Sequence, residues 1–85
     1  MKQIDIYTTP LCGYCHAAKR LLTQKGVKYR EFDLTTDPMF RAEMQRRAPG
    51  SRTVPQIFIG ETHVGGCNEL YALNDKGRLD PLLAV

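Results

Sequence analysis

The sequence is short of cysteine, of long apolar runs and of net charge, and each shortage excludes a class of protein. No stretch approaches the roughly 20 apolar residues that a membrane-spanning helix needs. The N-terminal segment lacks the apolar core of a secretory signal, because Asp5 interrupts it. Three cysteines are an odd number, which does not fit the fully paired disulfide framework of a small secreted protein. We therefore expect an intracellular, cytoplasmic protein that binds no membrane and whose first residue already belongs to the fold.

The formal net charge of +3 is too small to indicate a nucleic-acid-binding protein. It suits a small anionic ligand or an acidic partner. The densest basic cluster consists of Arg46, Arg47 and Arg52 in "MQRRAPGSR". Two interpretations of this cluster stay open, a solvated helix end with its loop or a surface that attracts an anionic substrate.

The length of 85 residues predicts one domain, spanning 1–85. Alternating or continuous apolar residues predict four strands, the last two joined as a hairpin at Gly60-Glu61. These strands cover 3–7, 27–34, 56–60 and 62–64.

Helical periodicity and capping residues place the helices between these strands. Apolar residues at i, i+3, i+4, i+7 and i+8 from Tyr14 predict an amphipathic helix that Gly26 ends. An N-cap aspartate followed by proline begins a second helix, and a glycine pair opens a third. The segments are 14–24, 38–48 and 67–76, and 79–85 form a terminal turn or helix.

The order of these elements predicts the fold class. A strand, helix and strand within about 34 residues form a right-handed crossover with a parallel strand pair. The later hairpin completes an α/β fold with a four-stranded mixed sheet, flanked by three or four helices. A pair of cysteines between the first strand and the first helix of such a unit is the thioredoxin-like redox arrangement.

That pair is Cys12 and Cys15 in "CGYC". At a helix start, free backbone N–H groups and the helix dipole stabilise the thiolate of Cys12, the form that attacks disulfides. Cys15 lies three residues later, turned further into the fold, and suits the resolving role. Tyr14 either walls the sulfur or packs in the core, while His16 points away from Cys12 and is expected to be solvated.

Two further segments are candidate binding elements. Thr53-Val54-Pro55 precedes the third strand, where a cis proline bond would expose the Val54 backbone to an extended peptide and a trans proline would be an ordinary loop. Gly66-Cys67-Asn68 opens the third helix, so its free N–H groups can meet a carboxylate, although the glycines also suit a plain turn.

Taken together, these residues resemble the glutaredoxins, specifically the small dithiol class. The resemblance covers essentially the whole chain and depends on three motifs and the C-terminal pattern, which occur in the order and spacing of the family. They are "CGYC" from Cys12, "TVPQIFIG" from Thr53, "GGCNEL" from Gly65 and the ending "LYAL…LDPLL".

The resemblance implies a thioredoxin fold with Pro55 in cis and a groove for glutathione as co-substrate. It implies that Cys12 attacks glutathione mixed disulfides and that Cys15 resolves them by forming a Cys12–Cys15 redox-active disulfide. Protein disulfides, such as that of ribonucleotide reductase, are then reduced by a monomer without an obligatory metal. The implied glutathione-binding residues are Tyr14, Thr53, Val54, Pro55, Gly66, Cys67 and Asn68.

Three departures from the family pattern are present. Gly13 replaces the usual proline between the cysteines, Thr8-Thr9-Pro10 lack the lysine common before the first cysteine, and Asn68 stands where aspartate is common. Arg47 or Arg52 would then supply the positive charge of that lysine, which stabilises the thiolate and binds a glutathione carboxylate.

Two metal alternatives stay open at this point. A [2Fe–2S] cluster held between two subunits by Cys12 and glutathione is favoured by the small residue Gly13. A zinc site built from Cys12, Cys15, Cys67 and either histidine uses ligands that zinc accepts, although it leaves the "TVP" segment unexplained.

Overall fold

The computed structural model describes residues 2–84, and Met1 and Val85, to which the sequence predictions also extended, lie outside the described residues. Eight helices and strands follow one another along this range. They are β1 (Ile4–Thr8), α1 (Gly13–Gln24), β2 (Arg30–Asp33), α2 (Pro38–Arg47), β3 (Gln56–Ile59), β4 (Thr62–Gly65), α3 (Cys67–Asp75) and α4 (Leu79–Leu83).

The four strands form one mixed sheet in the order β2-β1-β3-β4. β1 pairs in parallel with β2, with Ile6 opposite Glu31. β1 and β3 are antiparallel, as are β3 and β4, which a turn at Gly60 joins. The predicted mixed sheet with a parallel crossover and a hairpin is therefore confirmed.

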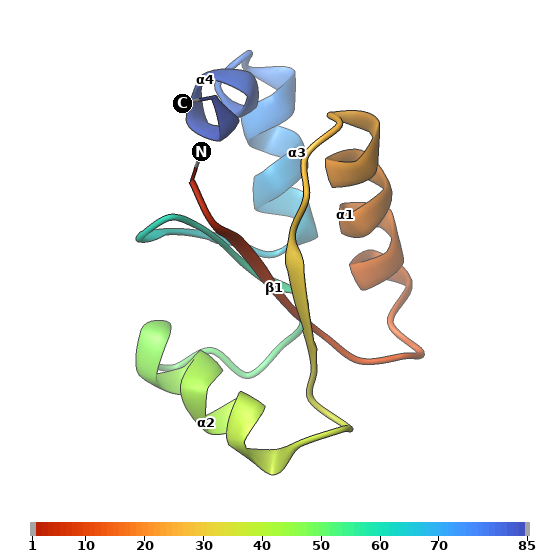
Figure 1. The fold of residues 1–85 in the computed structure, drawn as a ribbon, viewed down its shortest axis with the longest axis vertical. Coiled ribbons are helices and arrows are strands. Elements are labelled where there is room, and N and C mark those ends of the chain that lie inside the picture. Colours follow the sequence, from red (N-terminus) through yellow and green to blue (C-terminus); the bar gives the residue numbers. More distant parts are fainter. Residues whose placement is uncertain (1, 85) are drawn as a thin grey trace.

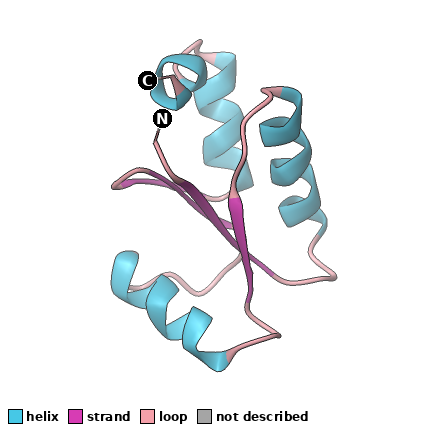
Figure 2. Ribbon diagram, viewed as in Figure 1, coloured by secondary structure: helices cyan, strands magenta, loops and turns pink. Residues whose placement is uncertain are grey.

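Helices cover both faces of the sheet (Figures 1 and 2), with α1 and α3 side by side on one face and α2 on the other. Two apolar clusters fill the spaces between the layers. The larger joins strand residues such as Ile6 and Ile57 to Leu22 of α1 and Leu70 of α3. The smaller lies under α2, where Met44 packs against Tyr7 and Phe58. Among the described residues, no helix is long and apolar enough to cross a membrane.

The second strand is shorter than the predicted 27–34, because residues 27–29 make no pairing with β1 and Val27 still belongs to the turn that ends α1. The N–H of Val27 donates to the carbonyl oxygen of Leu22 at 3.4 Å, and Gly26 takes a φ of 75°. Val27 and Tyr29 nevertheless pack against the larger cluster. Their apolar character reflects burial beneath the helix end, and strand pairing begins only at Arg30.

A buried carboxylate fixes the middle of the sheet. Asp5 is 3% exposed and accepts hydrogen bonds from Arg30 Nε at 2.8 Å and from Arg47 Nη1 at 2.9 Å. Arg47 also donates to Tyr7 Oη and lies 4.1 Å above the ring centroid of Phe58. Burial alone would raise the pKa of Asp5, but the two guanidinium groups outweigh burial and hold that pKa below its ordinary value.

Candidate active site

Cys12 is the N-cap of α1, so its backbone is extended while the helix begins at Gly13. Its Sγ accepts a hydrogen bond from the backbone N–H of Cys15 at 3.0 Å. An N-cap side chain ordinarily satisfies one of the free N–H groups of the first turn in this way. The sulfur that the sequence predicts as nucleophile therefore lies where N–H groups and the helix dipole stabilise a thiolate.

Cys15 is fully buried in the first turn of α1, and all three cysteines are free thiols. Burial, with the neighbouring Cys12 sulfur, raises the pKa of Cys15 to about 12, while the backbone of Thr9 and the charge of Lys19 act in the opposite direction. At neutral pH Cys15 is therefore a protonated thiol. The two cysteines differ in environment as their predicted roles require.

The loop before β3 lies directly opposite Cys12. The Cys12 thiol donates to the carbonyl oxygen of Val54 at 3.6 Å, across 42 residues of sequence. The Val54–Pro55 peptide bond is cis, as the resemblance implied and unlike the ordinary trans loop. Pro55 itself is buried.

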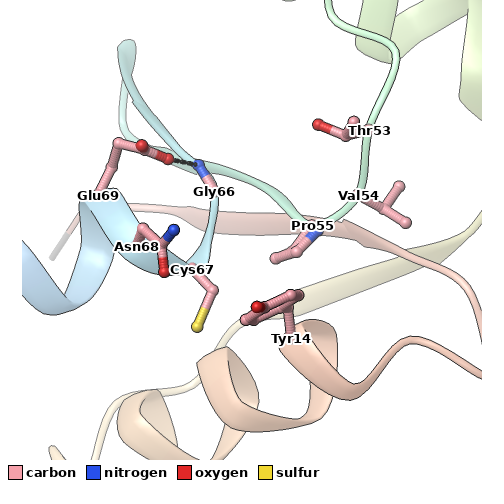
Figure 3. A pocket seen from close by; sticks show the side chains of 8 residues that line it. All are labelled: Tyr14, Thr53, Val54, Pro55, Gly66, Cys67, Asn68 and Glu69. Atoms are coloured by element: carbon pink, nitrogen blue, oxygen red, sulfur yellow. Dashed lines mark hydrogen bonds between the residues drawn. The ribbon is translucent and has the colours of Figure 1, made fainter.

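A cavity of about 190 Å³ opens beside this contact, between the loop before β3 and the start of α3. Figure 3 shows the side chains of Tyr14 and Cys67 projecting into the space between α1 and α3. All seven residues predicted to bind glutathione line this one cavity, together with Glu69. The lining is Tyr14, Thr53, Val54, Pro55, Gly66, Cys67, Asn68 and Glu69.

Glu69 is the lining residue that the sequence reasoning missed. Its Oε1 accepts a hydrogen bond from the N–H of Gly66 at 2.7 Å (Figure 3), so it caps the start of α3 from the third helical position. A Cβ on Gly66 would lie 3.2 Å from that oxygen and 3.4 Å from the carbonyl oxygen of Pro55. The glycine thus allows the two walls of the cavity to approach each other. The sequence signal that could have identified Glu69 is a glutamate three residues after a glycine that opens a helix.

The structure also decides between the two interpretations of Tyr14. Tyr14 is 66% exposed and walls the cavity, so the alternative core position is wrong. Cys67 also lines the cavity, but it is only 7% exposed, and burial raises its pKa.

The histidines do not join the cysteines in a metal site. His16 is exposed, as predicted, with Nε2 3.0 Å from the carbonyl oxygen of Pro10, and His63 Nε2 lies 2.7 Å from Gln56 Oε1. Within residues 2–84, no three histidine, cysteine, aspartate or glutamate side chains are grouped so that they could hold a metal ion. The four-ligand zinc arrangement has no counterpart in this geometry.

The basic cluster divides into two different environments. Arg47 is committed to Asp5 and Tyr7, so the prediction that it could replace the missing lysine at the site is wrong. Arg52 is exposed and adjoins Thr53 of the cavity lining, and no ion pair of Arg52 occurs among the described residues.

Comparison with known proteins agrees with this geometry. The sequence model of the Glutaredoxin family matches residues 4–64. A "Glutaredoxin" from Pseudomonas aeruginosa is 55% identical over 85 residues, 100% of both chains. The solution structure of glutaredoxin from Brucella melitensis has a TM-score of 0.83 and 55% identity, covering 98% of this chain and 89% of that chain.

A second solved structure is that of a buckwheat glutaredoxin–glutathione complex, with a TM-score of 0.86 and 32% identity. The likeness covers 96% of this chain and 76% of that chain. With an N-cap cysteine and a buried cysteine at one helix start, on a fold that these structures share, the chain is a thiol–disulfide oxidoreductase and belongs to the glutaredoxin family.

Proposed function

We propose that this protein uses glutathione to reduce glutathione mixed disulfides and protein disulfides. One observation carries the proposal: the Cys12 sulfur lies 3.6 Å from the Val54 carbonyl oxygen, and Val54 belongs to the wall of the adjacent cavity. A tripeptide bound in that cavity would place its own sulfur beside Cys12. The buckwheat glutaredoxin was crystallised with glutathione, and its fold is shared by this chain.

The residues of the cavity suit the parts of glutathione. The exposed backbone of Val54 pairs with the cysteinyl residue, as a short added strand. Cys67 and Asn68 begin α3, and their backbone N–H groups donate to the γ-glutamyl carboxylate, because the first turn of a helix has free donors and a positive dipole end. Tyr14 covers the sulfur from the opposite wall, and Arg52 attracts the anionic tripeptide.

The reaction with a glutathione mixed disulfide needs only Cys12. Its thiolate attacks the glutathione sulfur, the substrate protein leaves as a thiolate that takes up a proton, and a Cys12–glutathione disulfide remains. A second glutathione thiolate then attacks the glutathione sulfur of that disulfide. Oxidised glutathione departs, and the Cys12 thiolate is restored.

Protein disulfides require Cys15 as well. After Cys12 has formed a mixed disulfide with a substrate protein, Cys15 attacks Cys12 Sγ and releases the reduced protein, leaving a Cys12–Cys15 disulfide. Two glutathione molecules then reduce it. In this route a monomer in the cytoplasm would serve partners such as ribonucleotide reductase.

The experiment that tests the proposal compares glutathione with other thiols as the reductant. Turnover of a glutathionylated peptide is measured with glutathione, with cysteinylglycine and with cysteine at equal thiolate concentrations. We expect turnover with glutathione to exceed that with cysteinylglycine by at least about tenfold, because cysteinylglycine lacks the γ-glutamyl group held at α3. Equal rates with all three thiols would overturn glutathione dependence while leaving a thiol–disulfide oxidoreductase.

A second candidate function is the carriage of a [2Fe–2S] cluster between two copies of the chain. The observation that favours it is the open surface around Cys12, where Leu11 is 99% exposed and a Cβ at Gly13 would meet nothing within 4 Å. Cys12 would be the protein ligand, and a cluster would supply electron-transfer chemistry. Anaerobic reconstitution with iron, sulfide and glutathione should then give a brown dimer, and a colourless monomer would contradict this function.

A further inference from the structure

A polar chain links the end of β1 to the middle of α1, outside the glutathione cavity. Thr8 is 1% exposed, and its hydroxyl donates to Glu31 Oε2 at 2.7 Å. The same oxygen accepts from Lys19 Nζ at 3.0 Å, and the Lys19 side chain is only 21% exposed. Lys19 is therefore held against β2, whereas a lysine on a free helix face would extend into solvent.

The carboxyl group of Glu31 stays ionised at neutral pH. Burial would raise the pKa of Glu31, but the hydrogen bonds from Thr8 and Lys19 outweigh burial and lower that pKa below its ordinary value. Glu31 is thus a carboxylate that holds the ammonium group in place. The hydroxyl of Thr8 in turn fixes Glu31, because a buried hydroxyl keeps its acceptor.

Lys19 lies four residues after Cys15 on α1, which places their Cβ atoms roughly 5–6 Å apart on one helix face. Cys15 is the fully buried thiol of the pair, and the backbone of Thr9, next to Thr8, acts to lower its pKa. The other titratable groups nearby oppose its ionisation or are already paired. Cys12 opposes the ionisation, and Glu31 on β2 is already paired with Lys19.

We propose that Lys19, held by Glu31 and Thr8, is a positioning residue for the resolving step performed by Cys15. The inference rests on the proposed function, in which Cys15 attacks a mixed disulfide at Cys12. In that step the Cys15 thiol loses its proton as its sulfur bonds to Cys12 Sγ. The bond from Cys12 to the departing thiol breaks, and the departing thiolate takes up one proton, so that no other oxidant or reductant is needed.

An ammonium group at this place stabilises the negative charge that develops on Cys15 during the attack. In agreement with this stabilisation, the charge of Lys19 acts to lower the pKa of Cys15, whereas burial raises it. Reactions that use Cys12 alone involve no such charge on Cys15. Lys19 should therefore affect the dithiol route and leave the single-cysteine route far less changed.

The test is a single-turnover measurement on the reduced full-length chain. The protein is mixed with oxidised glutathione or, separately, with 2-hydroxyethyl disulfide, quenched in acid at set times, and analysed by mass spectrometry. Formation of the Cys12 mixed disulfide and its conversion to the Cys12–Cys15 disulfide give two separate rates, each recorded from pH 5 to 9. The variants are Lys19→Met and Lys19→Arg, with Lys25→Met as the control.

Lys25 is a matched control, because it caps the other end of α1 and its Nζ pairs with Asp80 at 2.8 Å. We expect Lys19→Met to slow resolution about three- to tenfold at pH 7 and to displace its pH profile to higher pH. Lys19→Arg should restore most of the rate, and Lys25→Met should match the unsubstituted chain.

An unchanged resolution rate in Lys19→Met would overturn the inference. So would a loss that Lys19→Arg does not rescue or that leaves the pH profile in place, since either result indicates a structural role. If the protein reacted with 2-hydroxyethyl disulfide but showed no preference for glutathione, that outcome would contradict the proposed function instead. The comparison of resolution rates still decides the role of Lys19 in that case, because both disulfides produce a mixed disulfide at Cys12.

Discussion

The backbone N–H of Cys15 donates a hydrogen bond to the Sγ atom of Cys12 at 3.0 Å. This contact gives the two cysteines different chemistry although three residues separate them. Cys12 receives a donor at the open end of α1, and Cys15 is 0% exposed beneath it. The helix start thus provides one more accessible sulfur and one buried sulfur, which is the difference that the proposed roles of nucleophile and resolving thiol require.

The first prediction concerns alkylation of the reduced protein. The pKa of Cys15 is raised to about 12, so its thiol stays protonated from neutral pH up to roughly pH 11. Iodoacetamide at pH 7.5 should modify Cys12 at least about a hundredfold faster than Cys15, as measured by peptide mass spectrometry. Comparable rates at both positions would contradict the separation of their roles.

A second prediction concerns the buried carboxylate. Asp5→Asn should lower the free energy of unfolding at pH 7 by about 2–4 kcal/mol, because it leaves the guanidinium group of Arg47 without its charged partner. The folded-state pKa of Asp5 lies below its unfolded value, so the contribution of the carboxylate is present above about pH 4. It is lost as the pH falls through the folded-state pKa.

Urea denaturation at pH 7 and at pH 2.5 measures this difference. The stabilities of Asp5→Asn and the unsubstituted chain should converge at the lower pH. Glu61→Gln, in the exposed hairpin turn, serves as the control and should change little at either pH. A gap between Asp5→Asn and the unsubstituted chain that stays constant with pH would show that charge pairing does not cause it.

A third prediction compares two glycines. Gly65 has a φ of 111°, and a Cβ there would lie 3.1 Å from Glu69 Cγ, so Gly65→Ala should cost about 1–3 kcal/mol of stability. Gly13 begins α1 with nothing within 4 Å of a Cβ, so Gly13→Ala should leave stability unchanged or raise it by about 0.5 kcal/mol. Thermal unfolding distinguishes the two, and equal losses would contradict the packing described at Gly65.

A fourth prediction concerns the wall formed by Tyr14. Tyr14 is 66% exposed and lines the cavity beside Pro55. Tyr14→Ala should raise the KM for a glutathionylated peptide about three- to tenfold, because the ring supplies apolar contact area. Tyr14→Phe keeps the ring and should stay within about twofold. If Tyr14→Ala left the KM unchanged, the ring would play no part in binding.

Much of the fold could be predicted because local signals and burial agree. The apolar stripe of α1, the Asp37-Pro38 helix start and the Gly60 turn all specify local conformations, and each element appeared where predicted. The start of β2 could not be placed, since Val27 is apolar for packing under a helix end and makes no strand pairing. Periodicity does not distinguish these two kinds of burial.

The site could be predicted as a set of residues, but its electrostatics could not. Side chains far apart in sequence decide which arginine is available. Only the folded chain shows that Arg47 is held by Asp5, while Arg52, next to the lining residue Thr53, is exposed. The partner of Lys19 is likewise visible only in the folded chain, where its Nζ forms an ion pair with Glu31 of β2. Motifs indicate which sulfur reacts, and the tertiary structure determines the charges around it.

The most direct measurement is the turnover of a glutathionylated peptide by Cys12→Ser and Cys15→Ser, with glutathione as reductant and the same total protein. The account predicts that Cys12→Ser loses at least about a thousandfold in kcat/KM, because no accessible thiolate remains. It predicts that Cys15→Ser keeps at least about a third of the activity on this substrate, while its reduction of a protein disulfide falls far more. Equal loss in both variants on the glutathionylated peptide would contradict the assignment of Cys12 as nucleophile and Cys15 as resolving thiol.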